Sequence, residues 1–214
     1  MLLTVLKWVL LCVAAYLLGS VTFATIIAKK QAGLDIRTVG SRNSGMSNMV
    51  VTLGPKAGFL TLLGDAGKGA AAVLLAFLLF GFDSIEIAAL AAFLAMLGHI
   101  YPVFFKFKGG KGTAVMGGAI LALQPLLFII IIVSFIAILL ITKYIAYSTI
   151  FADLIYPAGM LLFFWHSPNK WWLLPLCLGV SILSISKHIE NLKHIKNNEE
   201  QKFALDMLLK TKSG

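Results

Sequence analysis

The amino-acid sequence predicts an all-α membrane protein, a polytopic bundle of about seven transmembrane helices that forms a single domain over residues 1–214. Of these residues 59% are hydrophobic and 13% are charged, whereas a soluble domain is about 45–50% apolar and about 25% charged. Long apolar stretches also recur along the chain, and most approach the ~17–25 residues that a helix needs to cross a bilayer. The composition therefore excludes a soluble globular core.

Seven apolar segments account for the expected helices. In chain order they are residues 2–28, 59–82, 85–105, 113–123, 126–142, 148–165 and 171–186. The first is longer than the roughly 7–15 apolar residues of a cleaved signal peptide, and no A-x-A site follows it, so we expect it to remain as a helix. The fourth is short, and it is either completed by burial inside the bundle or merged with its neighbour around Gln124-Pro125. The second possibility leaves six spans as the alternative.

Lysine and arginine are divided unevenly between the two sides of this predicted bundle. With seven spans, one side carries the C-terminal tail, residues 187–214, and nine basic loop residues: Lys29, Lys30, Arg37, Arg42, Lys56, Lys106, Lys108, Lys111 and Lys143. The opposite side has little beyond Lys7 and Lys170. The positive-inside rule places the basic side and the C-terminus in the cytoplasm and the N-terminus outside. The net charge of +9 therefore suits an anionic membrane face and anionic ligands, and does not indicate nucleic acid.

A polar stretch, "DIRTVGSRNSGMSN" at residues 35–48, follows the first span on the basic side. Glycine, serine and asparagine favour turns and can bond through side chain and backbone, and successive N–H groups in such turns form anion-binding nests. The alternative is an ordinary solvated loop. The length of the stretch and its lack of acidic residues after Asp35 favour the anion site.

A second basic-side stretch, "KFKGGKGT" at residues 106–113, combines three lysines with three glycines. Glycines permit close backbone approach to a ligand, and lysines supply charge-assisted donors to phosphate. It is not a Walker A loop, because Phe105 stands where the first glycine should be and Gly112 follows Lys111. The alternative is a juxtamembrane loop that holds anionic lipid headgroups. His99, just ahead of the stretch, is more typical of a hydrogen-bonded packing residue than of a catalyst.

The last predicted helix carries a polar stripe. Spacings of 3, 4 and 3 place four polar side chains on one helix face: Ser181, Ser184, His188 and Asn191. The two serines are typical of helix packing, while His188 and Asn191 lie at the cytoplasmic mouth and are the better functional candidates. Asp65 and Lys68, three residues apart in another span, are interpreted as a mutually neutralising pair.

These motifs resemble those of the bacterial acyl-phosphate:glycerol-3-phosphate acyltransferases, integral membrane enzymes of phospholipid synthesis. The resemblance runs from "LGSVTFATIIAK" at Leu18 to the tail. The first family motif is similar to residues 35–48, where the expected order is kept by Gly40, Ser41, Asn43, Gly45 and Asn48. "GHIYPVFFKFKGGKGTA", residues 98–114, matches the second motif almost throughout. The third motif, His188-x-x-Asn191 with Glu199 and Glu200 downstream, matches loosely.

The resemblance implies transfer of a fatty acyl group from acyl phosphate to the 1-hydroxyl of glycerol 3-phosphate, giving lysophosphatidic acid and phosphate without a covalent acyl-enzyme. It implies a catalytic group made of Ser41, Lys111, His188 and Asn191. It also implies that substrate and phosphate are bound by Asn43, Ser47, Asn48, Lys106, Lys108, Gly109, Gly110, Gly112 and Thr113. Further candidates are Arg42, His99 and Glu200.

The same resemblance implies no cofactor and no metal ion. The implied partners are glycerol 3-phosphate, acyl phosphate and membrane lipids, with a functional link to the enzyme that makes acyl phosphate. The implied location is the cell membrane, with the active site facing the cytoplasm. Cys12 and Cys177 both lie in apolar segments, where a buried, inert thiol is the usual state.

Two departures from the family pattern leave a second hypothesis open. An arginine that clamps phosphate usually stands three residues after the first motif, where this chain has Val51. Valine cannot replace arginine at a bidentate phosphate site, and Arg42, where the family commonly has glycine, is the candidate to compensate from another direction. The alternative function is therefore a catalytically weak or inactive protein of the same fold that binds a phospholipid or a phosphorylated ligand.

The lysine and arginine asymmetry generates the first testable prediction. A reporter fused after Gly214 should be cytoplasmic, and one inserted within residues 167–169 should be external, because the basic loops are retained on the cytoplasmic side. Paired fusions that are active on opposite sides of the membrane would provide the measurement. Finding both reporters on the same side would contradict the seven-span arrangement.

Overall fold

The computed structural model describes residues 1–203, and residues 204–214 of the predicted tail, including the fusion point at Gly214, lie outside the described part. Within residues 1–203 every regular element is a helix. The α-helices are α1 (Leu2–Ser20), α2 (Phe23–Ala32), α3 (Met46–Leu53), α4 (Pro55–Phe80), α5 (Ile85–Ile100), α6 (Thr113–Leu123), α7 (Pro125–Thr142), α8 (Ile145–Phe163) and α9 (Lys170–Lys196). Two short 3₁₀ helices complete the order, η1 (Ile36–Thr38) and η2 (Val103–Phe105).

The helix lengths agree with an integral membrane protein. Six stretches of residues 1–203 are long and apolar enough to cross a bilayer, when α1 and α2 are counted as one continuous stretch, Leu2–Ala32. The prediction of an all-α membrane bundle is therefore confirmed. The short segment α6 has 11 residues, which reach about 17 Å of a hydrocarbon core that is ~30 Å thick. The number of spans, seven or six, stays a prediction.

The structure corrects three of the expected helix boundaries. The first apolar segment is broken because Val21 and Thr22 are extended, and the Val21 carbonyl accepts a bond from Lys68 Nζ at 2.6 Å. The third segment leaves the α-helix at Ile100, two residues before Pro102, which has no N–H to donate. The last helix continues to Lys196, so the polar residues at its end keep their helical spacing.

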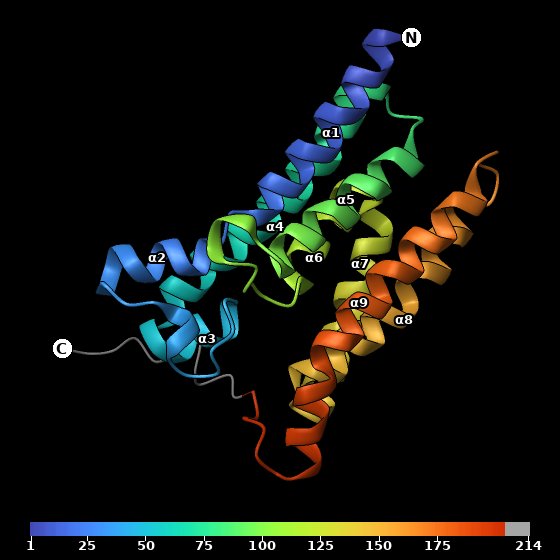
Figure 1. The fold of residues 1–214 in the computed structure, drawn as a ribbon. Helices are drawn as coiled ribbons and strands as arrows, with labels where there is room; N and C mark the ends of the chain where they lie inside the picture. The colour runs from blue at the N-terminus through green and yellow to red at the C-terminus, as the bar shows by residue number, and fades with distance from the viewer. Residues whose placement is uncertain (204–214) are drawn as a thin grey trace.

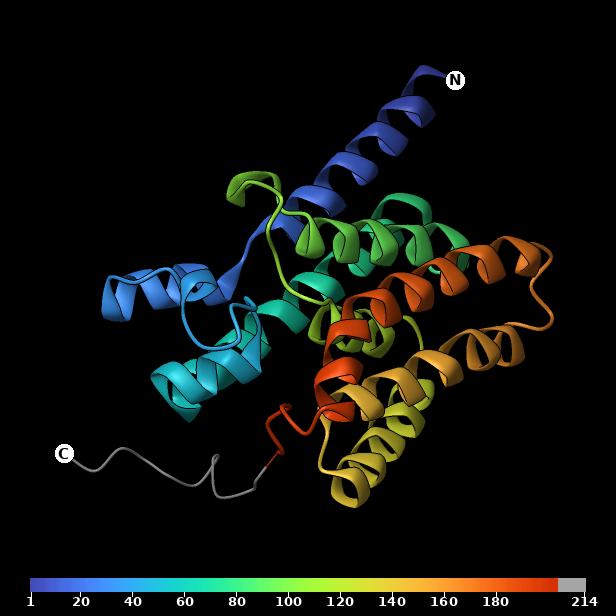
Figure 2. The same ribbon diagram turned by 60° about the horizontal axis from the view of Figure 1, so that its bottom comes forward.

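Polar contacts between helix ends and loops group at two opposite ends of the bundle. At one end Lys7 Nζ donates to the Leu79 carbonyl at 2.8 Å, and Ser167 Oγ donates to Glu86 Oε1 at 2.6 Å. At the other end the Phe203 N–H donates to the Lys143 carbonyl at 2.7 Å. Figures 1 and 2 show α2 and α3 beyond this second end, away from the N-terminus. The polar motifs of the sequence therefore gather at the second end.

Two helix pairs approach so closely that only glycine fits at the crossing. Helices α1 and α5 lie side by side, as do α4 and α6 (Figure 1). A Cβ added to Gly98 of α5 would lie 2.2 Å from the Tyr16 carbonyl oxygen of α1, and one added to Gly118 of α6 would lie 1.9 Å from the Ala66 carbonyl oxygen of α4. Small residues at such crossings let the backbones of membrane helices pack directly. These crossings determine where α5 ends and α6 begins, and the loop between them contains the glycine-lysine stretch.

Helix α4 offers a matched pair of glycines that tests this packing. Gly69→Ala should lower the free energy of unfolding by about 1–3 kcal/mol, as overpacking does, because its Cβ would lie 2.0 Å from the Val115 carbonyl oxygen. Gly67→Ala, two residues away, meets nothing within 4 Å and should be neutral or stabilising. Denaturation in mixed detergent micelles measures both variants. Equal losses of stability in the two would contradict the glycine crossing.

Candidate active site

The first polar loop, residues 35–48, is organised by one buried side chain. The Asn48 Oδ1 atom accepts a bond from the Ser41 N–H at 3.1 Å. Its Nδ2 atom lies 3.0–3.1 Å from three carbonyl oxygens of the same loop, those of Ile36, Val39 and Asn43. The amide of Asn48 is therefore occupied within the loop. In this structure Asn48 organises the loop, and its expected contact with substrate stays a prediction.

Arg37 ties the first loop to the second. Its guanidinium bonds both carboxylate oxygens of Asp35, with Nη2 to Oδ2 at 2.7 Å, and donates from Nη1 to the Phe105 carbonyl at 2.7 Å. The guanidinium also lies 5.6 Å from the centre of the Phe105 ring. The hydrogen bonds from Arg37 hold the pKa of Asp35 below its usual value. Arg37 thus acts as a charged link between the two loops. The sequence did not reveal this role, because Phe105 is 68 residues away along the chain.

The glycine-lysine stretch divides into two parts with different surroundings. In the first part Lys106 and Phe107 are exposed and both have positive φ angles, 55° and 58°. The Val103 N–H just before them lies 3.4 Å from Ser20 Oγ of α1, and Figure 2 shows η2 beside that helix. Lys108 is exposed as well. The structure therefore places Lys106 and Lys108 on the surface near α1, whereas the motif predicted them around the bound phosphate.

The second part passes beneath the end of α5 and begins α6. The Gly109 N–H donates to the Ile100 carbonyl at 3.2 Å, and the Gly110 N–H donates to the His99 carbonyl at 3.1 Å. Gly112 is the N-cap of α6, with a φ of 95° that favours glycine. The backbone donors of Gly109 and Gly110 are therefore used by α5, and the expectation that these residues hold phosphate stays a prediction. The N–H groups that begin α6 are further candidates, because a helix N-terminus attracts anions.

Lys111, Asn191 and Glu200 meet at the start of α6, although they come from distant parts of the chain. Lys111 Nζ donates to Asn191 Oδ1, and Asn191 Nδ2 donates to Glu200 Oε1 at 2.6 Å. His194 Nδ1 lies 3.8 Å from Glu200 Oε2. Burial lowers the pKa of Lys111, and the nearby carboxylates of Glu200 and Glu190 partly offset this shift. The three predicted residues thus form one network around a half-buried cation.

His188 lies one helical turn from this network, and its environment determines which ring nitrogen can accept a bond. Its Nδ1 atom lies 2.9 Å from the Ser184 carbonyl oxygen. Because a carbonyl oxygen can only accept, Nδ1 must carry a proton, and in the neutral ring Nε2 is then an acceptor. The predicted polar stripe is confirmed as a buried face of α9, with Ser181 Oγ donating to the Asp153 carbonyl at 2.6 Å.

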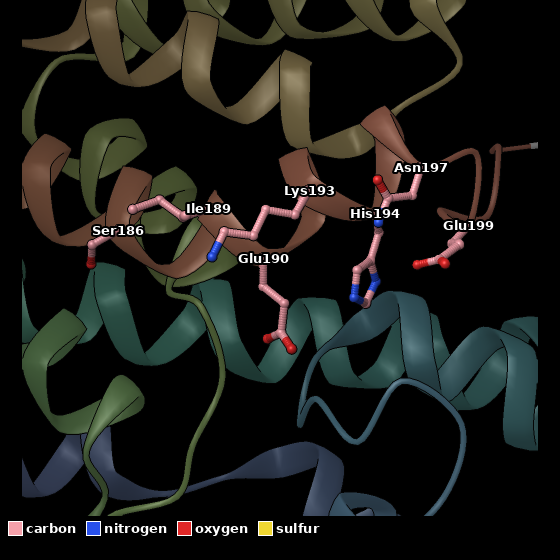
Figure 3. A pocket seen from close by; sticks show the side chains of 7 residues that line it. All are labelled: Ser186, Ile189, Glu190, Lys193, His194, Asn197 and Glu199. Carbon is pink, nitrogen blue, oxygen red and sulfur yellow. The ribbon is translucent and has the colours of Figure 1, made fainter.

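A cavity of about 560 Å³ opens beside the C-terminal end of α9. Figure 3 shows Glu190 and His194 projecting into it from the same side of the helix. The lining residues are Ser186, Ile189, Glu190, Lys193, His194, Asn197 and Glu199. Its lining residue His194 lies 3.8 Å from Glu200, and Glu190 acts electrostatically on Lys111, so the cavity adjoins the network.

Sequence reasoning missed a buried ionic cluster under the second loop. Asp65 Oδ1 lies 2.8 Å from Lys68 Nζ, and the same Nζ lies 2.9 Å from His99 Nδ1. The three residues are 1%, 5% and 3% exposed. Sequence reasoning interpreted the acid and the lysine as a simple pair and the histidine as a packing residue. The sequence does contain one indication of this cluster: two charged residues lie in one membrane segment, where charges are rarely retained without a function.

The remaining predicted residues lie around the first loop and at the start of α6. Ser41, Arg42 and Ser47 are exposed, and Asn43 is half-buried. Thr113 is the first residue of α6. Within residues 1–203 no hydrogen bond joins Ser41, Asn43 or Ser47 to Lys111, so their part in the site stays a prediction. No group of three His, Cys, Asp or Glu side chains among those residues is placed to hold a metal ion.

Comparison with known protein families matches residues 9–198 to the family described as glycerol-3-phosphate acyltransferase. The chain belongs to the glycerol-3-phosphate acyltransferase family. It is 40% identical over 194 residues to the glycerol-3-phosphate acyltransferase of Bacillus subtilis strain 168, which covers 90% of this chain and 96% of the relative. It is 37% identical over 199 residues to that of Clostridioides difficile strain 630, with coverage of 92% and 95%.

A solved structure supports the same assignment. The crystal structure of PlsY, an integral membrane glycerol 3-phosphate acyltransferase, in its glycerol 3-phosphate form is 34% identical and matches with a TM-score of 0.83, covering 95% of this chain and 99% of that one. Its lysophosphatidic acid form matches with a TM-score of 0.80 at 33% identity. The membrane bundle is therefore that of an acyltransferase of phospholipid synthesis, as its motifs predicted.

The divided second loop generates a prediction about its lysines. Lys111→Ala should raise the KM for a phosphate-bearing substrate about tenfold to a hundredfold, the loss expected for a charge-assisted hydrogen bond of about 1.5–3 kcal/mol. Lys106→Ala should change it by less than about threefold, as exposed charges do. Steady-state kinetics of the purified variants provide the measurement. Equal losses in the two variants would return Lys106 to the phosphate site that the motif predicted.

Proposed function

We propose that this acyltransferase takes its acyl group from acyl phosphate and transfers it to the 1-hydroxyl of glycerol 3-phosphate at the cytoplasmic face of the cell membrane. The observation that carries the proposal is the position of Lys111. It is a half-buried cation, it directly precedes the N-cap of α6, and it donates to Asn191, which in turn donates to Glu200. A lysine and a helix N-terminus that converge at one point form a site for a phosphoryl group.

The reaction is one acyl transfer with a good leaving group. The glycerol 1-hydroxyl oxygen forms a bond to the acyl carbonyl carbon, the bond from that carbon to the phosphate oxygen breaks, and the hydroxyl proton leaves with the released phosphate. Lys111 and the first N–H groups of α6 would stabilise the negative charge that develops on the departing phosphate. Because acyl phosphate is already activated, most of the acceleration can come from placing the two substrates together.

His188 and Asn191 are the candidates that orient glycerol 3-phosphate. The acceptor Nε2 of His188 suits a hydroxyl donor, since Nδ1 is bonded to the Ser184 carbonyl. Asn191 already contacts Lys111, so a substrate held by both would lie beside the phosphate site. Ser41 and Ser47, which are exposed on the first loop, are the candidates for the opposite wall. Arg42 is exposed there too and can supply a further cation.

The proposed membrane arrangement has seven crossings, with the N-terminus outside. The grouping of polar contacts at two opposite ends supports it, because α6 and α7 then run in opposite directions between these ends. The basic residues would place the end with Lys143 and Phe203 in the cytoplasm. An enzyme that makes acyl phosphate would then supply the donor from the same side of the membrane.

A second candidate function is phosphoryl-ligand binding without efficient catalysis. It is favoured by Val51, which occupies the position of the family's arginine and is 52% exposed on α3. No other described feature favours it over the acyltransferase activity that the family membership carries.

An assay of the purified protein tests the proposed donor. With acyl phosphate and glycerol 3-phosphate together, phosphate release should depend on both substrates and match the lysophosphatidic acid formed. Acyl-thioester donors in place of acyl phosphate serve as the comparison. Product formation that is equally fast from a thioester would contradict acyl phosphate as the specific donor, and the absence of any transfer in folded protein would favour the binding function.

The exposed position of Val51 leads to a prediction about the missing arginine. Val51→Arg should raise kcat/KM about tenfold to a hundredfold if its guanidinium reaches a substrate phosphate, because it restores a charge-assisted hydrogen bond. The side chain can be accommodated because residue 51 points away from the packed core. Kinetics of wild type, Val51→Arg, Arg42→Ala and the double variant separate the two cations. An unchanged kcat/KM for Val51→Arg, together with loss in Arg42→Ala, would show that Arg42 already fills the role.

A further inference from the structure

The buried cluster of Asp65, Lys68 and His99 lies between the break that separates α1 from α2 and the two polar loops of the site. Lys68 Nζ donates to the Val21 carbonyl at 2.6 Å, at the break between α1 and α2. It also contacts Asp65 Oδ1 at 2.8 Å and His99 Nδ1 at 2.9 Å. One ammonium therefore hydrogen-bonds a helix break and an imidazole and forms an ion pair with a carboxylate. A pair that served mutual neutralisation alone would not need the second and third contacts.

The contact with Lys68 determines the proton position on His99. An ammonium group has three donors and no acceptor, so His99 Nδ1 must accept the bond. The proton of the neutral ring is then on Nε2. The Asp65 carboxylate, 2.8 Å from the lysine nitrogen, offsets part of the cost of burying an ammonium inside a membrane bundle. Asp65 Oδ1 also lies 3.6 Å from His99 Nδ1, farther than the lysine nitrogen does.

The opposite side of the His99 ring faces the junction of the two site loops. A Cβ added to Gly110 would lie 2.2 Å from His99 Nε2 and 3.1 Å from the Ser44 carbonyl oxygen. The Gly110 N–H in turn donates to the His99 carbonyl. Gly110 directly precedes Lys111, and Ser44 belongs to the first polar loop. The ring nitrogen that Lys68 leaves protonated is thus next to the backbone where both loops meet.

We propose that Lys68 and Asp65 are positioning residues that hold His99 as the Nε2-protonated tautomer and aim this N–H at the loop junction, where it serves as a donor to a phosphate-bearing substrate. The inference rests on the proposed function for its substrate, but the tautomer itself does not depend on that function. A donor whose direction is fixed before the substrate arrives loses little conformational freedom on binding, so it contributes to the affinity for the substrate phosphate. The charged pair inside the membrane segment therefore acts on the site through the histidine.

The tautomer is tested first, without substrate. Solution or solid-state NMR of protein labelled with ¹⁵N histidine should show His99 with a protonated Nε2 and an unprotonated Nδ1, and a His99→Gln sample assigns the signal among the four histidines. A ring protonated at Nδ1, or at both nitrogens, would overturn the proposal. Removing one charge alone would leave a buried, unpaired partner, so the variant compared is Asp65→Asn with Lys68→Met. Its His99 signal should move to a mixture of tautomers, and an unchanged signal would also overturn the proposal.

Kinetics then test whether the donor serves the reaction. Asp65→Asn/Lys68→Met should raise the KM for acyl phosphate or glycerol 3-phosphate by about tenfold with a smaller change in kcat, whereas Lys68→Arg, which keeps a charged donor, should retain most of the wild-type value. His99→Gln places an amide N–H near the Nε2 position and should keep more activity than His99→Asn, whose amide lies near the Nδ1 position. Similar KM values in wild type, the double variant and His99→Asn would overturn the positioning role. If wild type itself shows no acyl transfer, the proposed function fails, while the NMR result still decides the tautomer.

Discussion

The direct backbone packing of α1 on α5 and of α4 on α6 is the constraint on which the rest of the structure depends. Gly98 and Gly118 stand where any side chain would collide with a carbonyl oxygen of the neighbouring helix. In a bilayer, lipid tails are as apolar as the helix surfaces, so close packing replaces the hydrophobic effect as the force that joins helices. Because both pairs are held at short range, the end of α5 and the start of α6 are placed within reach of one glycine-rich loop.

That loop combines two tasks that its sequence presents as one motif. Its surface half exposes Lys106 and Phe107 in left-handed backbone conformations, which cost free energy for residues other than glycine. Its inner half uses the N–H groups of Gly109 and Gly110 to bond the last carbonyls of α5. Helix ends leave such carbonyls without intrahelical partners. The glycines therefore suit the close passage beneath α5, and Lys111 and the start of α6 are the candidates for binding an anion.

Charge inside the bundle is retained where it has several partners. Lys68 contacts a carboxylate, an imidazole and the carbonyl freed by the helix break at Val21. The desolvation of two ions exceeds what a single pair recovers in many proteins, so the additional contacts make the cluster tolerable. Lys111 has a different setting, half-buried beside Asn191 and the open cavity of α9. Lys68 is therefore buried, whereas Lys111 remains accessible to a ligand.

The sequence by itself determined the class of the protein, most of its helices and its family, because apolar length, basic loops and the "GGKG" motif are local properties. It also predicted the stripe from Ser181 to Asn191, since helical spacing depends on the chain alone. Only the tertiary structure decided that Lys111 meets Asn191 and Glu200, that Asn48 folds its own loop, and that Lys106 lies on the surface. Those contacts depend on which backbone groups remain without a partner after the helices pack. The residues that make the contacts are far apart in the chain, so local patterns do not predict them.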